Sequence, residues 1–82
     1  MNIQIISQDT DGERTYYKFQ GKRNEVEIIT NAKLGYINVN YKNATHKAYR
    51  GPGKVFWSMY EAMNAYKSSE MKSFFRYIES VS

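Results

Sequence analysis

Apolar and polar residues alternate along much of the first half of the chain. Between Arg14 and Gln20, Tyr17 and Phe19 fall on one side of an extended chain and more polar residues fall on the other. The same period of two runs through residues 25–30 and 36–41. This alternation predicts three half-buried strands, each with one face directed toward a core.

Two further strands are predicted at residues 2–6 and 45–50. Turns rich in Gly, Asn and Asp are expected between the strands, at residues 8–12, 21–24, 31–35 and 42–44. Because these connections are short, the strands are expected to pair as an antiparallel meander.

After Gly53 the period changes to that of a helix. The apolar stripe consists of Val55, Met59, Ala62 and Tyr66. SSE at 68–70 supplies a serine N-cap for a second helix, or marks a kink in one long helix. The apolar face beyond it consists of Met71, Phe74, Phe75, Ile78 and Val81.

These patterns predict an α+β fold in one domain, residues 1–82. A four- or five-stranded antiparallel sheet is followed by one or two C-terminal helices that pack on one face of the sheet. The alternation within the strands predicts that the other face stays exposed to solvent.

The formal charge of +4 is distributed unevenly along the chain. Residues 1–13 carry three acidic side chains and no Lys or Arg, whereas residues 14–58 carry nine Lys or Arg against two Glu. This asymmetry favours a polyanionic partner, with nucleic acid first and an acidic protein second. A solvated surface without a binding role is the alternative.

Side chains with catalytic or metal-binding chemistry are scarce. The chain has no cysteine and a single histidine, His46, and no catalytic motif surrounds it. Asp9 and Asp11 begin like a calcium loop, but its later ligands do not follow, so a turn is expected. Glu25 and Glu27 are expected to pair with neighbouring Lys or Arg. We therefore expect neither an enzyme nor a metal or cofactor site.

GPGK at 51–54 resembles the end of a phosphate loop. A Walker motif needs Gly and Ser or Thr where this chain has Ala48 and Val55, which excludes a nucleotide site of that type. Phosphate contact at a helix start after Gly53 and a structural strand-to-helix corner remain as alternatives. Trp57 lies off the helical stripe, so it either packs at the sheet edge or is an exposed stacking or interface residue.

The exposed sheet face is the main candidate site, because it interleaves tyrosine with basic and amide groups. Bases stack on tyrosine rings, and Lys or Arg follows the phosphates. Tyrosines that serve only as strand formers are the alternative. The residues predicted to contact nucleic acid are Tyr16, Lys18, Lys22, Arg23, Lys33, Tyr36, Asn38, Lys42, Lys47, Tyr49, Arg50 and Lys54.

Two local resemblances point to nucleic-acid binders. LGYINVNY at 34–41 is similar to the first RNP strand of RNA-recognition domains, but the predicted order lacks the helix that follows their first strand, which excludes that family. EVEIITNAKLGYINV at 25–39 resembles the strand–turn–strand of a PUR repeat, and the layout resembles PUR-repeat and PC4-like single-stranded nucleic-acid-binding domains. That resemblance implies binding on the sheet face and a homodimer.

The first functional hypothesis is therefore a small, non-catalytic, basic protein that binds single-stranded RNA or DNA. The alternative is a phage-type inhibitor of a host defence protein, such as a toxin or CRISPR effector, that acts by protein–protein binding. A small ribonuclease is a third option. Abundant Tyr, Lys, Asn and Ile, which have A/T-rich codons, favour a phage or mobile element as the source. The N-terminal apolar run is too short for a signal peptide or membrane span, so a cytoplasmic location is expected, in a bacterium or infected host cell.

Overall fold

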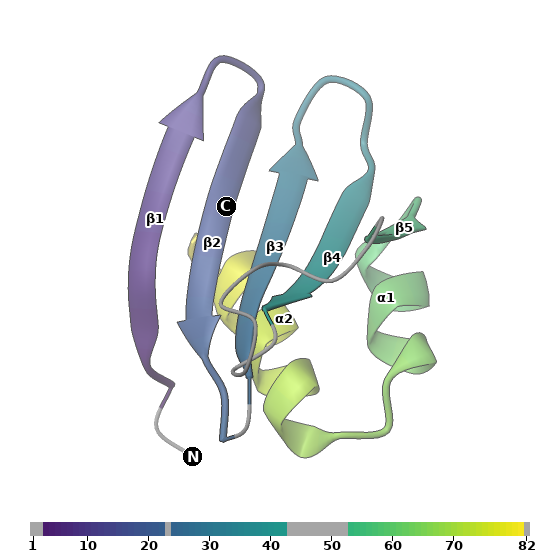
Figure 1. The fold of residues 1–82 in the computed structure, drawn as a ribbon. Helices are drawn as coiled ribbons and strands as arrows, with labels where there is room; N and C mark the ends of the chain where they lie inside the picture. The colour runs from purple at the N-terminus through teal and green to yellow at the C-terminus, as the bar shows by residue number, and fades with distance from the viewer. Residues whose placement is uncertain (1–2, 23, 43–52, 82) are drawn as a thin grey trace.

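A computed structural model describes residues 3–22, 24–42 and 53–81. Within these residues, five antiparallel strands form one sheet and are followed by two helices, which confirms the predicted α+β arrangement (Figure 1). The strands are β1 (Ile5–Asp11), β2 (Arg14–Gln20), β3 (Glu25–Asn31), β4 (Ile37–Lys42) and β5 (Lys54–Phe56), and the helices are α1 (Met59–Ala65) and α2 (Ser69–Val81). The spatial order of the strands is their order in the chain, so the sheet is a meander.

The pairing register separates two faces of the sheet. Tyr17 on β2 lies opposite Ile28 on β3, which lies opposite Val39 on β4, and all three are buried. The intervening positions form the second face, where Tyr16 lies opposite Ile29. The alternation in the sequence therefore gave the correct face for each of the three central strands.

Both helices pack on one side of the sheet, which we call the covered face (Figure 1). The core between sheet and helices consists of Tyr17, Phe19, Val26, Ile28, Ile37, Val39, Phe56, Ala62, Met71, Phe74, Phe75 and Ile78. The opposite side, which we call the open face, carries no helix of the described residues, as the sequence predicted.

The second helix begins where its serine cap predicts. The Ser68 hydroxyl accepts a hydrogen bond from the Met71 amide at 3.4 Å, and the Ser68 carbonyl accepts one from the Lys72 amide. A serine in this position satisfies an amide that has no partner within the helix. At the other end, Val81 is exposed, which corrects its predicted place on the buried face.

The first strand and its turn differ from the prediction. The strand was expected at residues 2–6 and the turn at 8–12, but β1 extends to Asp11 and the turn centres on Gly12, with φ of 63°. The polar residues in β1 are compatible with a strand because β1 is the outermost strand of the sheet, where side chains stay in solvent.

The segment after Gly53 also differs from the prediction. Residues 54–56 form β5, and α1 starts only at Met59, so Val55 belongs to a strand and not to a helical stripe. Val55 and Phe56 are strand formers, and pairing with β4 places Phe56 in the core. The strand predicted at 45–50 lies outside the described residues.

Neither described helix is long and apolar enough to cross a membrane.

Candidate nucleic-acid interface

The open face holds a hollow of about 330 Å³ near the ends of β2, β3 and β4. Aromatic, amide and basic side chains surround it together with one apolar residue. Its lining consists of Arg14, Tyr16, Ile29, Tyr36, Asn38, Asn40 and Gly53. Tyr16, Ile29 and Asn38 are cross-strand neighbours, so the sheet itself forms the floor of the hollow.

One wall of the hollow depends on a glycine. The Asn40 amide Nδ2 donates to Asn38 Oδ1 at 2.7 Å, which fixes the two amides relative to each other. A Cβ atom at Gly53 would collide with the Oδ1 atoms of both asparagines and lie 2.7 Å from the Val39 carbonyl oxygen. Only glycine lets the chain that leads into β5 lie against the two amides.

The turn between β3 and β4 positions Tyr36 at the hollow. Asn31 is buried, and its Oδ1 accepts hydrogen bonds from the amides of Lys33 and Leu34 at 3.0 and 2.7 Å. Gly35 follows with φ of 80°, a conformation that glycine adopts without strain. Together these residues close the turn immediately before Tyr36.

Arg14 supplies a positive charge at the end of the hollow that is next to the β1–β2 turn. Its pKa is raised above the ordinary value, first by a hydrogen bond to the side chain of Tyr16 and then by electrostatic interaction with Tyr36. The guanidinium therefore interacts with both tyrosine side chains and remains charged. Its five donors suit an anion such as a phosphate.

The open face also carries two carboxylates, Glu25 and Glu27, toward its opposite end. Glu27 lies opposite Lys18 on β2 and opposite Asn40 on β4. Burial raises the pKa of Glu27 above its usual value, with the charge of Lys18 opposing this and that of Glu25 adding to it. The described part of the face is thus mixed in charge. Arg14 and the two tyrosines lie toward the end with the β1–β2 and β3–β4 turns, and Lys18 lies beside the carboxylates.

The predicted contact residues fall into three groups. The structure brings Tyr16, Lys18, Tyr36 and Asn38 together on the open face. The turn residues Lys22 and Lys33 are exposed, and Lys54 lies opposite Val39, which places it on the other side of the sheet. Outside the described residues, or described only in their backbone, are Arg23, Lys42, Lys47, Tyr49 and Arg50.

Four lining residues were absent from the predicted contact set, namely Arg14, Ile29, Asn40 and Gly53. The spacing of Arg14 could have revealed its place, because it precedes Tyr16 and Lys18 in the same alternation. Gly53 carries no such signal, since its role depends on how β5 approaches β4. The prediction that a helix starts after Gly53 was wrong, because residues 54–56 form β5. The free helix amides that were expected to contact a phosphate at that point are therefore absent.

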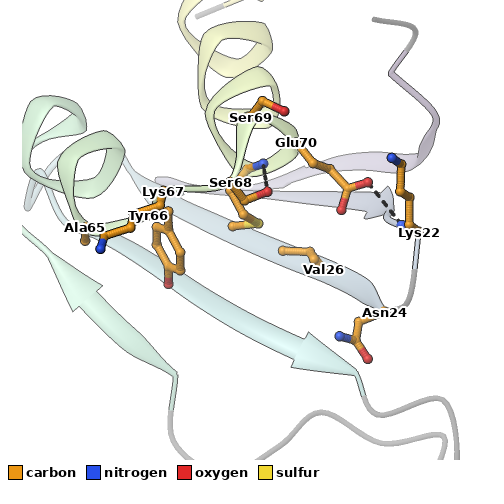
Figure 2. Close-up of a pocket in the computed structure, with 10 residues that line it drawn as sticks. Lys22, Asn24, Val26, Ala65, Tyr66, Lys67, Ser68, Ser69 and Glu70 are labelled. Carbon is orange, nitrogen blue, oxygen red and sulfur yellow. Dashed lines mark hydrogen bonds between the residues drawn. The ribbon is translucent and has the colours of Figure 1, made fainter.

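A second hollow, of about 450 Å³, lies at the helix side of the molecule (Figure 2). Its lining includes the buried core residues Val26 and Met71 and the segment between α1 and α2. Glu70 Oε2 accepts a hydrogen bond from the Lys22 amide at 3.1 Å (Figure 2). This contact holds the start of α2 against the β2–β3 turn, so we assign these residues to the structure of the domain.

Among the described residues, no three His, Cys, Asp or Glu side chains are grouped so that they could hold a metal ion. Comparisons with protein-family models, with curated proteins and with solved structures found no match for this chain.

Proposed function

We propose that the protein binds single-stranded nucleic acid on its open face, with one base seated in the hollow. The observation that carries the proposal is the convergence of two tyrosines, two asparagines and Arg14 on that hollow. A base can stack on a tyrosine ring, its edge can hydrogen-bond to the amides, and Arg14 can contact the adjacent phosphate. A base must leave its stack to enter such a site, which favours single strands over duplexes.

The charges on the face favour one path for the nucleic-acid backbone. Phosphates are attracted by Arg14 and by Lys33 in the neighbouring turn, whereas the charge of Lys18 is opposed by Glu27 on the adjacent strand. The nucleic-acid backbone would therefore follow the end of the sheet that carries the β1–β2 and β3–β4 turns. The similarity of 25–39 to a PUR repeat supports the same use of a sheet face.

Inhibition of a protein by direct docking is the second candidate. The observation that favours it is a set of large apolar side chains in solvent, which includes Leu34, Val55, Trp57 and Tyr60. Exposed aromatic residues are common anchors of protein interfaces.

Fluorescence anisotropy with labelled single-stranded RNA, single-stranded DNA and duplex DNA tests the proposal. We expect single strands to bind best, with an affinity that falls steeply between about 50 and 200 mM salt. Tyr16→Ala should weaken binding by about 1–3 kcal/mol, the contribution of one stacked base. Arg14→Gln should weaken binding and reduce the salt dependence by about one phosphate contact.

Arg76→Gln is the matched control, because Arg76 is an exposed arginine on α2, on the other side of the sheet. Absence of binding at low salt would refute the proposal. An equal loss of affinity in the Arg14 and Arg76 variants would refute the assignment to the open face.

A further inference from the structure

Trp57 is the chain's one tryptophan, and 66% of its surface is exposed. It lies between β5 and α1, directly after Phe56, which is buried. An indole of this size left in water contributes little to the core. Its exposure leaves the indole accessible to a ligand.

The indole is exposed but held in position. Its ring meets the ring of Tyr36 edge-on, with centroids 6.1 Å apart and planes at 83°. The Trp57 amide donates to Glu61 Oε2 at 3.4 Å, and the Glu61 amide donates to the Ser58 hydroxyl at 3.0 Å. Because ring and backbone are both anchored, a ligand that stacks on Trp57 loses little free energy in ordering it.

The contact with Tyr36 makes Trp57 continuous with the hollow, because Tyr36 is also part of the hollow's lining. Val55 is 48% exposed and lies opposite Asn38, so the open face extends to β5. Tyr16, Tyr36 and Trp57 thus follow one another from β2 toward the β5 side of the sheet.

The orientation of the two rings determines whether one base can stack on both. The ring planes of Tyr36 and Trp57 are at 83° to each other. A base stacked flat on Tyr36 is therefore nearly perpendicular to the indole and cannot also stack on Trp57.

We infer that Trp57 stacks on a second base of the same strand, so that the ligand is a single strand of at least two nucleotides that crosses the sheet from β2 toward β5. This inference rests on the proposed function of the open face. It assigns Tyr16 and Tyr36 to the first base and Trp57 to its neighbour.

Tryptophan fluorescence of the wild-type protein gives the direct test, because Trp57 is its only source. With excitation selective for tryptophan, a short single-stranded oligonucleotide should quench the emission at the concentrations at which anisotropy shows binding. A mononucleotide should occupy the hollow and leave the emission nearly unchanged. Trp57→Ala should weaken oligonucleotide binding about 5- to 150-fold, and Trp57→Phe should restore part of the loss.

Tyr60→Ala is the control, because Tyr60 is 80% exposed on α1. If the oligonucleotide binds but neither quenches Trp57 nor loses affinity in the Trp57→Ala variant, the inference is overturned and the proposed function stands. If no oligonucleotide binds, both fail. If Trp57→Ala removes binding of a purified protein partner and leaves oligonucleotide binding intact, Trp57 belongs to a protein interface and the inference is again overturned.

Discussion

Phe19 of β2 and Phe74 of α2 stack face to face, with ring centroids 4.4 Å apart and planes within 11° of parallel. The ring of Tyr77 is nearly perpendicular to that of Phe19, with centroids 5.8 Å apart and planes at 87°. These ring contacts pack α2 against the covered face of the sheet. The open face can therefore consist of polar and aromatic groups without loss of the core.

Truncating this stack should destabilise the fold strongly. Phe74→Ala is expected to lower the free energy of unfolding by about 3–5 kcal/mol, because it leaves a cavity under the sheet. Phe74→Leu should lose less, since it keeps most of the volume. Urea unfolding followed by circular dichroism measures both, with the exposed Leu34→Ala as a control expected to stay within about 0.5 kcal/mol of wild type. A loss below about 1 kcal/mol for Phe74→Ala would contradict this account of the core.

Glu27 should make stability depend on pH. Burial raises the pKa of its carboxyl, so the folded protein holds this proton more tightly than the unfolded chain does. The associated stabilisation is present in acid, below the ordinary carboxyl pKa, and is lost as pH rises through the folded value. Glu27→Gln should therefore be more stable than wild type at neutral pH, and the difference should vanish in acid.

Urea unfolding at several pH values between about 4 and 7 measures this difference. Glu79→Gln, at an exposed position on α2, removes the same charge far from Lys18 and Glu25. A Glu27 variant that matches the Glu79 variant at every pH would show that burial of Glu27 has no such effect.

The same carboxylate should also limit nucleic-acid affinity. Glu27 lies opposite Asn40, at the margin of the hollow, where its charge repels phosphates. Glu27→Gln is expected to tighten binding of a single-stranded oligonucleotide several-fold at low salt. The gain should shrink at high salt, because ions screen the repulsion. Anisotropy titrations at two salt concentrations measure it, and an equal gain from Glu79→Gln would indicate an effect of net charge alone.

Sequence periodicity was sufficient for the parts of the fold that are amphipathic. β2, β3 and β4 each bury one face, so their alternation located the core and placed Tyr16, Tyr36 and Asn38 on the open face. The buried residues of α2 recur at helical spacing, and Ser68 marked its start. These signals are local, and the sequence contains them directly.

The edges of the sheet could not be predicted in the same way. β1 is exposed along nearly its whole length, so it shows no alternation, and Asp9 and Asp11 together with the following Gly12 indicated a turn. The start of α1, by contrast, is indicated by a local sequence pattern that the periodicity of apolar residues does not include. Ser58 and Glu61 form the Ser-x-x-Glu pattern of a capping box, which predicts a helix from residue 59.

Gly53 should be required for the wall of the hollow. Gly53→Ala would place a Cβ against the amides of Asn38 and Asn40, so the chain leading into β5 would have to move. We expect a loss of about 1–3 kcal/mol of stability from overpacking, together with weaker oligonucleotide binding. Gly12→Ala is the control, because no atom lies within 4 Å of the added Cβ and only the positive φ opposes it. It should cost stability but leave binding unchanged.

The helix cap should contribute measurably to the stability of α1. The Ser58 hydroxyl accepts from the Glu61 amide at 3.0 Å, and Ser58→Ala removes that acceptor. We expect a loss of about 1 kcal/mol in the free energy of unfolding. Ser80→Ala, near the end of α2, provides a serine control outside any N-cap. Equal unfolding curves for the two variants would contradict the capping role.

The meander order of the strands also bears on how the chain reaches its structure. Each strand pairs only with the strand next to it in the chain, so the hairpins β1–β2, β2–β3 and β3–β4 each close a short loop at small entropic cost. Isolated hairpins form in about 1–10 μs. Bringing Phe74 against Phe19 instead requires a contact between distant parts of the chain. We therefore expect this docking step, rather than growth of the sheet, to set the rate of folding.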